Sequence, residues 1–181
     1  NTGAPGPEQI YQTEMLALNL SGGSLPAGVM IRESPTRVSP GETRIRPVPG
    51  GFMISSFFDI FTEISLDGGQ TWSPGAEPAH MELWIDPTTV PPIATPTALQ
   101  LPPVEQYVGT APNVAAFASG LVLRNWEHKV HTLSVSPPAF GGSLSSPFDS
   151  QVDCQVSYDG GATFQPKRIP ANVNVRLTHY M

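Results

Sequence analysis

Histidine, cysteine and carboxylate side chains are the groups of this sequence that could carry chemistry. His128 and His131 lie three positions apart in a stretch that alternates apolar and polar residues. Positions i and i+3 of a strand face opposite sides, so this spacing favours two surface histidines over a pair of metal ligands. Cys154 is the single cysteine, and its place in another alternating run predicts a small buried residue rather than a nucleophile.

The carboxylates that could hold calcium fall into two groups: Asp59, Glu63 and Asp67, and Asp149, Asp153 and Asp159. Both groups are spread along predicted strands, whereas calcium loops gather their oxygen ligands at close spacing. No Gly-x-Ser-x-Gly motif, phosphate-binding loop or zinc-ligand spacing occurs in the sequence. The sequence therefore predicts a protein without enzyme activity, cofactor or resident metal.

The composition excludes several classes of protein. The 181 residues include 21 prolines and 17 glycines, and both residue types break helices, so a helix bundle or coiled coil is excluded. The formal net charge is −6, which is the wrong sign for a protein that binds the phosphate backbone of nucleic acids. No apolar run approaches the roughly 20 residues of a membrane-spanning helix, so we expect no membrane span.

The chain contains two copies of one sequence unit. Three blocks recur in the same order: Ser65–Pro74 as Ser157–Pro166 and Gly28–Arg32 as Gly120–Arg124 at an offset of 92 residues, and Ser55–Asp59 as Ser145–Asp149 at an offset of 90. A length change of two keeps every strand residue on its own face of a sheet. The repeated unit is therefore expected to consist of β-strands.

The repeat predicts two domains and two connecting segments. We expect an extended N-terminal tail over residues 1–14, repeat 1 over 15–86, a Pro-rich extended linker over 87–106 and repeat 2 over 107–181. Proline has no N–H to donate to a neighbouring strand, so the linker is not expected inside a sheet.

Alternation of apolar and polar residues is the main structural signal within each repeat. Val152, Cys154, Val156 and Tyr158 are expected to face inward, which is the period of a half-buried strand. Gly-Gly and Pro-Gly turn signals separate such runs at short spacing. We therefore expect an all-β protein of two tandem homologous antiparallel β-sandwich units, Ig-like or jelly-roll-like.

Each Asp-Gly-Gly segment, Ser65–Trp72 and Ser157–Phe164, resembles the Asp-box of bacterial neuraminidases and related proteins. In those families the Asp-box is a structural hairpin away from the active site, so the resemblance implies a structural turn and no neuraminidase activity. The turn residues are Asp67, Gly68, Gly69 and Trp72, and Asp159, Gly160, Gly161 and Phe164. The block Phe57–Trp72 also resembles uncharacterised secreted bacterial β-repeat proteins, which implies a secreted, cell-surface location.

The N-terminal tail predicts how copies of the chain associate. At the offset of 92, residues 1–14 correspond to the second half of the linker, so an extended segment precedes each repeat. Only repeat 2 of another copy offers the tail an equivalent acceptor, and such a head-to-tail contact builds a filament. We expect Ile10–Leu20 to add as a donor strand to that neighbour. The expected interface residues are Ile10, Tyr11, Met15, Leu16, Leu18, Leu20 and Trp84.

The sequence therefore predicts a structural subunit of a self-assembling, pilus-like extracellular bacterial filament or surface layer, with other copies of itself as partners. The alternative is a secreted carbohydrate-binding or adhesive module, in which Trp84 or Trp126 stacks on a glycan. Asn19-Leu20-Ser21 has the acceptor pattern for N-glycosylation in a secreted protein.

Overall fold

The computed structural model describes residues 6–49, 51–84, 106–110, 114–129 and 136–180, which contain strands and no helix. The strands are β1 (Gln9–Ser21), β2 (Met30–Glu33), β3 (Ser39–Val48), β4 (Gly51–Ile60), β5 (Thr62–Ser65), β6 (Ser73–Pro74), β7 (Ala79–Leu83), β8 (Tyr107–Gly109), β9 (Val114–Ala116), β10 (Val122–Lys129), β11 (Ser143–Ser157) and β12 (Gln165–His179). His131 and the predicted linker up to residue 105 lie outside the described residues.

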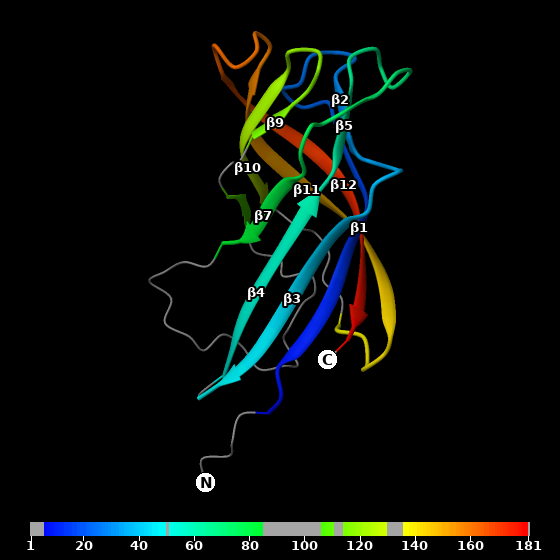
Figure 1. Cartoon of the computed structure of the whole chain (residues 1–181), viewed down its shortest axis with the longest axis vertical. Helices are drawn as coiled ribbons and strands as arrows, with labels where there is room; N and C mark the ends of the chain where they lie inside the picture. Colours follow the sequence, from blue (N-terminus) through cyan, green and yellow to red (C-terminus); the bar gives the residue numbers. More distant parts are fainter. Residues whose placement is uncertain (1–5, 50, 85–105, 111–113, 130–135, 181) are drawn as a thin grey trace.

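The strands form one closed antiparallel barrel (Figure 1). The barrel has eight staves, and each stave is either one long strand or two shorter strands that follow one another in line. Neighbouring staves follow one another along the chain, as in an up-and-down meander. Repeat 1 supplies four staves, namely β1, β2 with β3, β4 with β5, and β6 with β7. Repeat 2 supplies the other four, namely β8 with β9, β10, β11 and β12. Pairing of β12 with β1 closes the barrel.

The prediction of two separate β-sandwich units is therefore wrong. The first stave of each repeat pairs with the last stave of the other repeat, β1 with β12 and β8 with β7. Neither repeat has a sheet that closes on itself, so each repeat completes the other. In addition, β1 begins at Gln9, so residues 9–14 of the predicted tail belong to a barrel strand.

Strand registers in the two repeats are related by the same offset as the sequence. Ile31 of β2 pairs with Ile64 of β5, and Leu123 of β10 pairs with Val156 of β11, which is 92 residues later at both positions. Asp59 pairs with His80 in β4 and β7, whereas Asp149 pairs with Asn172 in β11 and β12, so offsets of 90 and 92 meet there.

Side chains fill the interior of the barrel. An eight-stranded barrel is just wide enough for inward side chains to pack against each other across the axis. The fully buried side chains include Tyr11, Leu20, Ile31, Ile45, Ile64, Leu123, Ile169 and Leu177. The cavity between Met15, Phe58, Tyr107 and Phe148 measures about 10 Å³, which is the size of one water molecule. This part of the interior therefore has no room for a larger ligand.

The inward pattern predicted for β11 is confirmed for three residues and wrong for one. Val152, Cys154 and Val156 are buried, but Tyr158 is 44% exposed. Tyr158 lies one residue past the end of β11, where the chain turns into the Asp-Gly-Gly hairpin and the alternation of faces ends.

Each Asp-Gly-Gly hairpin is held by its aspartate. Asp67 accepts hydrogen bonds from the backbone N–H of Thr71 at 2.9 Å and from the Ser65 hydroxyl at 2.8 Å. Asp159 accepts the equivalent bonds from Thr163 and Ser157, at 2.8 and 2.6 Å. Both glycines of each hairpin have positive φ, between 72° and 97°, a region that side chains disfavour.

Candidate functional site

The contact between β1 and β12, which we call the first seam, is the largest contact between the two repeats. It contains nine register pairs, from Tyr11 opposite His179 to Leu20 opposite Ala171, with an irregularity between Met15 and Ala17. β1 therefore pairs with β12, the last stave of repeat 2, over most of the length of β1.

Apolar side chains bury the inner face of the first seam. Tyr11, Met15, Leu18 and Leu20 are at most 5% exposed and lie beside equally buried residues of β12, among them Leu177. Full burial of one such side chain contributes about 1.5–3 kcal/mol. Ile10 is also buried and Leu16 is half-buried. The residues predicted to contact another copy thus lie at an interface, but the strand that they contact belongs to the same chain.

Ser24 anchors repeat 1 to β12 beyond the upper end of the first seam. The Ser24 hydroxyl donates to the carbonyl oxygen of Arg168 at 3.0 Å and accepts from the Arg168 backbone N–H at 2.7 Å. Gly23 makes this approach feasible, because a Cβ there would lie 2.3 Å from the Arg168 carbonyl oxygen. Its φ of +56° also favours glycine.

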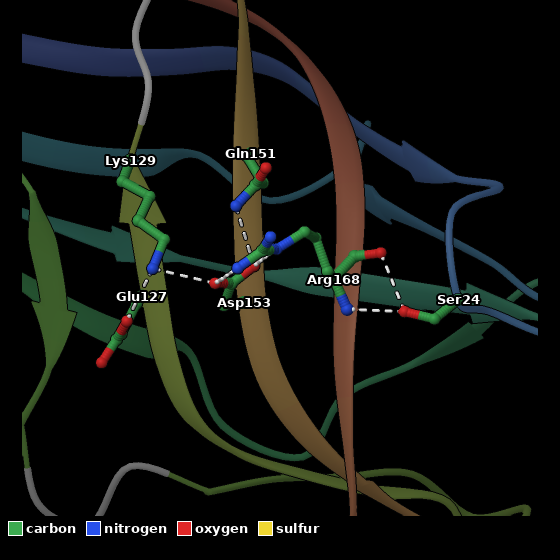
Figure 2. Close-up of polar contacts among 6 residues, drawn as sticks. All are labelled: Ser24, Glu127, Lys129, Gln151, Asp153 and Arg168. Atoms are coloured by element: carbon green, nitrogen blue, oxygen red, sulfur yellow. Dashed lines mark hydrogen bonds and ion pairs between the residues drawn. The ribbon is translucent and has the colours of Figure 1, made fainter.

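The side chain of Arg168 continues this contact into a ladder of charges across β12, β11 and β10 (Figure 2). Asp153 lies at the centre, 3.1 Å from Arg168 Nε and 2.8 Å from Lys129 Nζ. Lys129 is also 3.1 Å from Glu127, and Gln151 donates to Asp153 at 3.0 Å. Burial alone would raise the pKa of Asp153, but the bonds from Arg168 and Lys129 lower it. Asp153 of β11 is therefore an ionised carboxylate that contacts both neighbouring staves, through Lys129 of β10 and Arg168 of β12.

Two open depressions lie on the outer surface at the first seam. One, of about 500 Å³, spans β1, β3, β4 and β12 and includes Glu14 and Arg176, which form an ion pair at 3.1 Å. The other, of about 520 Å³, lies beside Ser24 and Arg168. Both are lined by hydroxyl, carboxylate and guanidinium groups that can form hydrogen bonds.

A second seam joins β7 of repeat 1 to β8 of repeat 2. It contains three register pairs, from Met81 opposite Gly109 to Leu83 opposite Tyr107. Trp84 follows β7, donates its backbone N–H to the Gln106 carbonyl at 2.8 Å, and is 48% exposed. The second seam is thus the shorter of the two, and Trp84 lies at its end.

Several candidate residues are placed differently from the sequence prediction. His128 is 5% exposed and lies 2.6 Å from the Ser150 hydroxyl, so the prediction of a surface histidine is wrong. Trp126 is 4% exposed, so it cannot stack on a sugar. A register shift between Arg124 and Glu127, where Asn125 has a φ of 54°, interrupts the alternation along β10 and places Trp126 and His128 on the same inner face as Leu123. Asn19 is exposed on the outer face of β1.

Cys154 and the carboxylates form no site among the described residues. Burial raises the pKa of the Cys154 thiol to about 12, so it is a poor nucleophile at neutral pH. In the part of the chain that the structure describes, no three His, Cys, Asp or Glu residues could hold a metal ion. Within the same residues, no helix is long and apolar enough to cross a membrane.

Gly23, Ser24 and Arg168 were not singled out by the sequence. They join the two repeats through a contact between Ser24 and Arg168, which are 144 positions apart in the sequence. The Gly22-Gly23 pair, a turn signal at the end of β1, is the one local sign of a close approach. Comparison with protein-family models, with curated proteins and with solved structures finds no match to this chain.

Proposed function

We propose that this protein is a non-catalytic structural subunit whose copies associate by exchanging repeats across the two seams. The observation that carries the proposal is the reciprocal closure of the barrel, in which β1 pairs with β12 and β8 pairs with β7. An interface that joins two parts of one chain can also join the same parts of two chains, as in domain swapping.

Opening of a seam exposes two complementary strand edges. β12 on repeat 2 then presents the free N–H and C=O groups that β1 had paired, and β1 presents the matching groups on repeat 1. Unpaired strand edges are templates for pairing with another chain. Because every copy carries the same two edges, the register between copies equals the register within one copy.

The pattern of exchange decides the size of the assembly. If repeat 1 and repeat 2 of one copy both complete barrels with the same second copy, the product is a closed dimer. If they complete barrels with two different copies, the product is an open head-to-tail chain, as expected for a filament. The segment Ile10–Leu20 acts as the exchanged edge in both products, now together with the rest of repeat 1.

Cysteine cross-linking across the first seam tests the proposal. Glu14 and Arg176 face each other on neighbouring strands and are partly exposed. Cα atoms of such pairs are about 4.5–5.5 Å apart, within the range that a disulfide bridges. A Glu14→Cys chain is mixed with an Arg176→Cys chain, concentrated and oxidised, and the cross-linked dimer is measured by non-reducing electrophoresis. We expect the mixed disulfide to form, because β1 of one copy pairs with β12 of the other.

The matched control lies within one repeat. Arg44 of β3 and Ser55 of β4 also face each other, but both belong to repeat 1 and are not exchanged. A mixture of Arg44→Cys and Ser55→Cys chains reports random collision of exposed thiols. The double variant Glu14→Cys/Arg176→Cys, which closes the seam within one chain, shows that both sites oxidise. Cross-linking across the seam at the level of the control contradicts the proposal.

A further inference from the structure

His80 lies on the outer face of β7 with its ring between two carboxylates. Its Nδ1 is 2.5 Å from Asp59 Oδ1 on β4, and its Nε2 is 3.1 Å from Glu82 Oε1 on β7. The ring of Phe57 stacks on the imidazole at a centroid distance of 5.5 Å. Both ring nitrogens of His80 therefore have a carboxylate oxygen as neighbour.

This geometry fits one protonation state of the imidazole. The neutral ring has one N–H donor and one acceptor nitrogen, so one of its nitrogens would face a carboxylate without a proton between them. Only the imidazolium donates to both Asp59 and Glu82. Partial burial would lower the pKa of His80, but the hydrogen bonds to Asp59 and Glu82 raise it above its usual value.

The groups around His80 carry mainly negative charge. On β8, which pairs with β7, Val108 and Thr110 have no charge. On β3, across Phe57, Glu42 is bound to Arg44. Glu127 of β10 lies beyond Val108 and is paired with Lys129. Arg176 of β12 lines the same surface depression as Asp59 and is paired with Glu14. Among the described residues, the ion pairs of Asp59 and Glu82 are those with His80.

Repeat 2 carries a counterpart of this cluster in which an asparagine takes the place of the histidine. Asp149 pairs with Asn172 as Asp59 pairs with His80, and the Asn172 amide donates to Asp149. Asn174 occupies the position that corresponds to Glu82. An amide donates one hydrogen bond at any ordinary pH. The chain thus contains the same strand contact with a histidine in repeat 1 and with an asparagine in repeat 2.

The position of His80 in the barrel gives this difference a consequence. β7 makes four register pairs with β4 and three with β8, whereas β12 makes fourteen with β11 and nine with β1. A contact between side chains is therefore a larger share of what holds β7 in place.

We propose that His80 is a pH-dependent clamp on β7, so that the second seam is closed more firmly below neutral pH and loosens above it. The clamp itself follows from the residues around His80. Its effect on assembly rests on the function proposed above: alkaline pH would release β7 and β8 for exchange between copies.

The direction follows from the protonation equilibrium. A histidine whose pKa is raised in the folded state adds stability that is fully present below its unfolded pKa of about 6.5. That stability is lost as the pH rises through the higher folded pKa. Asp59, His80 and Glu82 are each at least 34% exposed, so solvent screens the pairs and limits the effect.

Hydrogen exchange at the second seam tests the clamp. The backbone N–H of Thr110 donates to the His80 carbonyl and that of Trp84 to the Gln106 carbonyl, and both report on β7 and β8. Exchange is measured for the parent chain and for His80→Asn at pH 5.5 and pH 8.5. Comparison at equal pH cancels the intrinsic pH dependence of exchange. We expect the parent to be about 1.5–5-fold better protected than His80→Asn at pH 5.5, and the two to be equal at pH 8.5.

His80→Asn copies the Asn172 contact of repeat 2, so the variant keeps a donor to Asp59. The reverse variant Asn172→His places an imidazole beside Asp149 and serves as a second test on the same chain. It is expected to make protection of the β12 amides beside position 172 depend on pH more strongly than in the parent. Equal protection of parent and His80→Asn at pH 5.5 overturns the clamp.

The clamp and the repeat exchange can fail separately. If protection of the Thr110 and Trp84 amides depends on pH but Glu14→Cys and Arg176→Cys chains do not cross-link, the clamp is upheld and the exchange is contradicted. Thiol oxidation itself is faster at high pH, so the rate is divided by that of the mixture of Arg44→Cys and Ser55→Cys chains at the same pH. Cross-linking across the first seam whose normalised rate is the same at pH 5.5 and pH 8.5 upholds the exchange and overturns the effect of the clamp on it.

Discussion

Repeat 1 and repeat 2 are built from matching strands, but they differ in continuity. In repeat 2, β11 and β12 form one hairpin of fourteen register pairs. In repeat 1 the same hairpin is divided into β4 with β7, which has four pairs, and β5 with β6, which has two. The same sequence pattern thus gives one long ladder in repeat 2 and two short ladders in repeat 1.

A difference of two residues accounts for the division. Ile60 and Thr62 of repeat 1 are separated by Phe61 alone, whereas their counterparts Ser150 and Cys154 are separated by three residues. Residues 76–78 of repeat 1 therefore belong to no strand, and the ladder is interrupted between the Gly75 bridge after β6 and the start of β7. Strand continuity in this barrel is decided by chain length at one position rather than by strand propensity.

Deletions in β11 have the largest expected effect on this comparison. Removal of Val152 and Asp153 gives repeat 2 the spacing of repeat 1 while each remaining residue keeps its face. It removes a buried valine and the carboxylate hub of the charge ladder, and we expect a loss of about 4 kcal/mol in the free energy of unfolding. Deletion of Val152 alone inverts the faces on one side and is expected to prevent folding.

Urea unfolding followed by tryptophan fluorescence measures the double deletion, and circular dichroism measures the fold of the single deletion. A single deletion that is as stable as the double deletion contradicts this account of register.

Ile169 and Glu77 are counterparts at the place where the hairpin is continuous in one repeat and interrupted in the other. Ile169 is fully buried in β12, and Glu77 is exposed between β6 and β7. Ile169→Ala is expected to cost about 2–4 kcal/mol, because it leaves a cavity, and Glu77→Ala less than about 0.5 kcal/mol. Denaturant midpoints of the two variants give the comparison, and similar costs would contradict it.

Arg32 and Arg124 cover the aromatic residues of the two Asp-Gly-Gly hairpins, at 3.9 and 3.5 Å from the ring centroids of Trp72 and Phe164. Arg32 also forms an ion pair with Glu63 at 2.7 Å, and that carboxylate is 12% exposed. Arg32→Ala is expected to cost about 1–2 kcal/mol, because Glu63 loses its charged partner and keeps only the hydrogen bond from Ser34 among the described residues. Arg124→Ala removes a neutral contact with Gln155 and is expected to cost about 0.5–1 kcal/mol.

Thermal unfolding of the two arginine variants ranks them. With Glu63→Gln in the background, the two costs are expected to converge, and a difference that persists there rules out Glu63 as its source.

The smallest effect is expected in acid. Hydrogen bonds from Thr71 and then Ser65 lower the pKa of Asp67 to about 2, and bonds from Ser157 and Thr163 lower that of Asp159 further. A lowered carboxyl pKa gives stability above the unfolded pKa that is lost as pH falls through the folded pKa. In an acid titration followed by NMR, the Thr71 amide should therefore shift at higher pH than the Thr163 amide. The opposite order would contradict the hydrogen-bond assignment.

The sequence predicted those features that depend on neighbouring residues. Inward alternation at Val152, Cys154 and Val156 is confirmed, because half-buried strands are read with a period of two. The exposure of Trp84 follows in the same way. Tyr158 was misplaced because alternation carries no information about where a strand ends.

Closure of the barrel could not be read from local patterns. The sequence identifies two repeats, but it does not show which edge strands pair. The two edge strands of a repeat could pair with each other or with the edge strands of the other repeat. From the sequence we expect the tail to pair with another copy, because the pattern of each repeat is that of a complete unit. Pairing of Tyr11 with His179 and Leu20 with Ala171 shows that the acceptor lies in the same chain.

The end of β12 lies beside the start of β1, since the Tyr180 backbone N–H donates to the Ile10 carbonyl at 2.9 Å. Every strand pairing of the barrel is therefore kept in a circularly permuted chain that starts with repeat 2 and runs through a short joint into repeat 1. The fold therefore does not require that repeat 1 precede repeat 2 in the sequence.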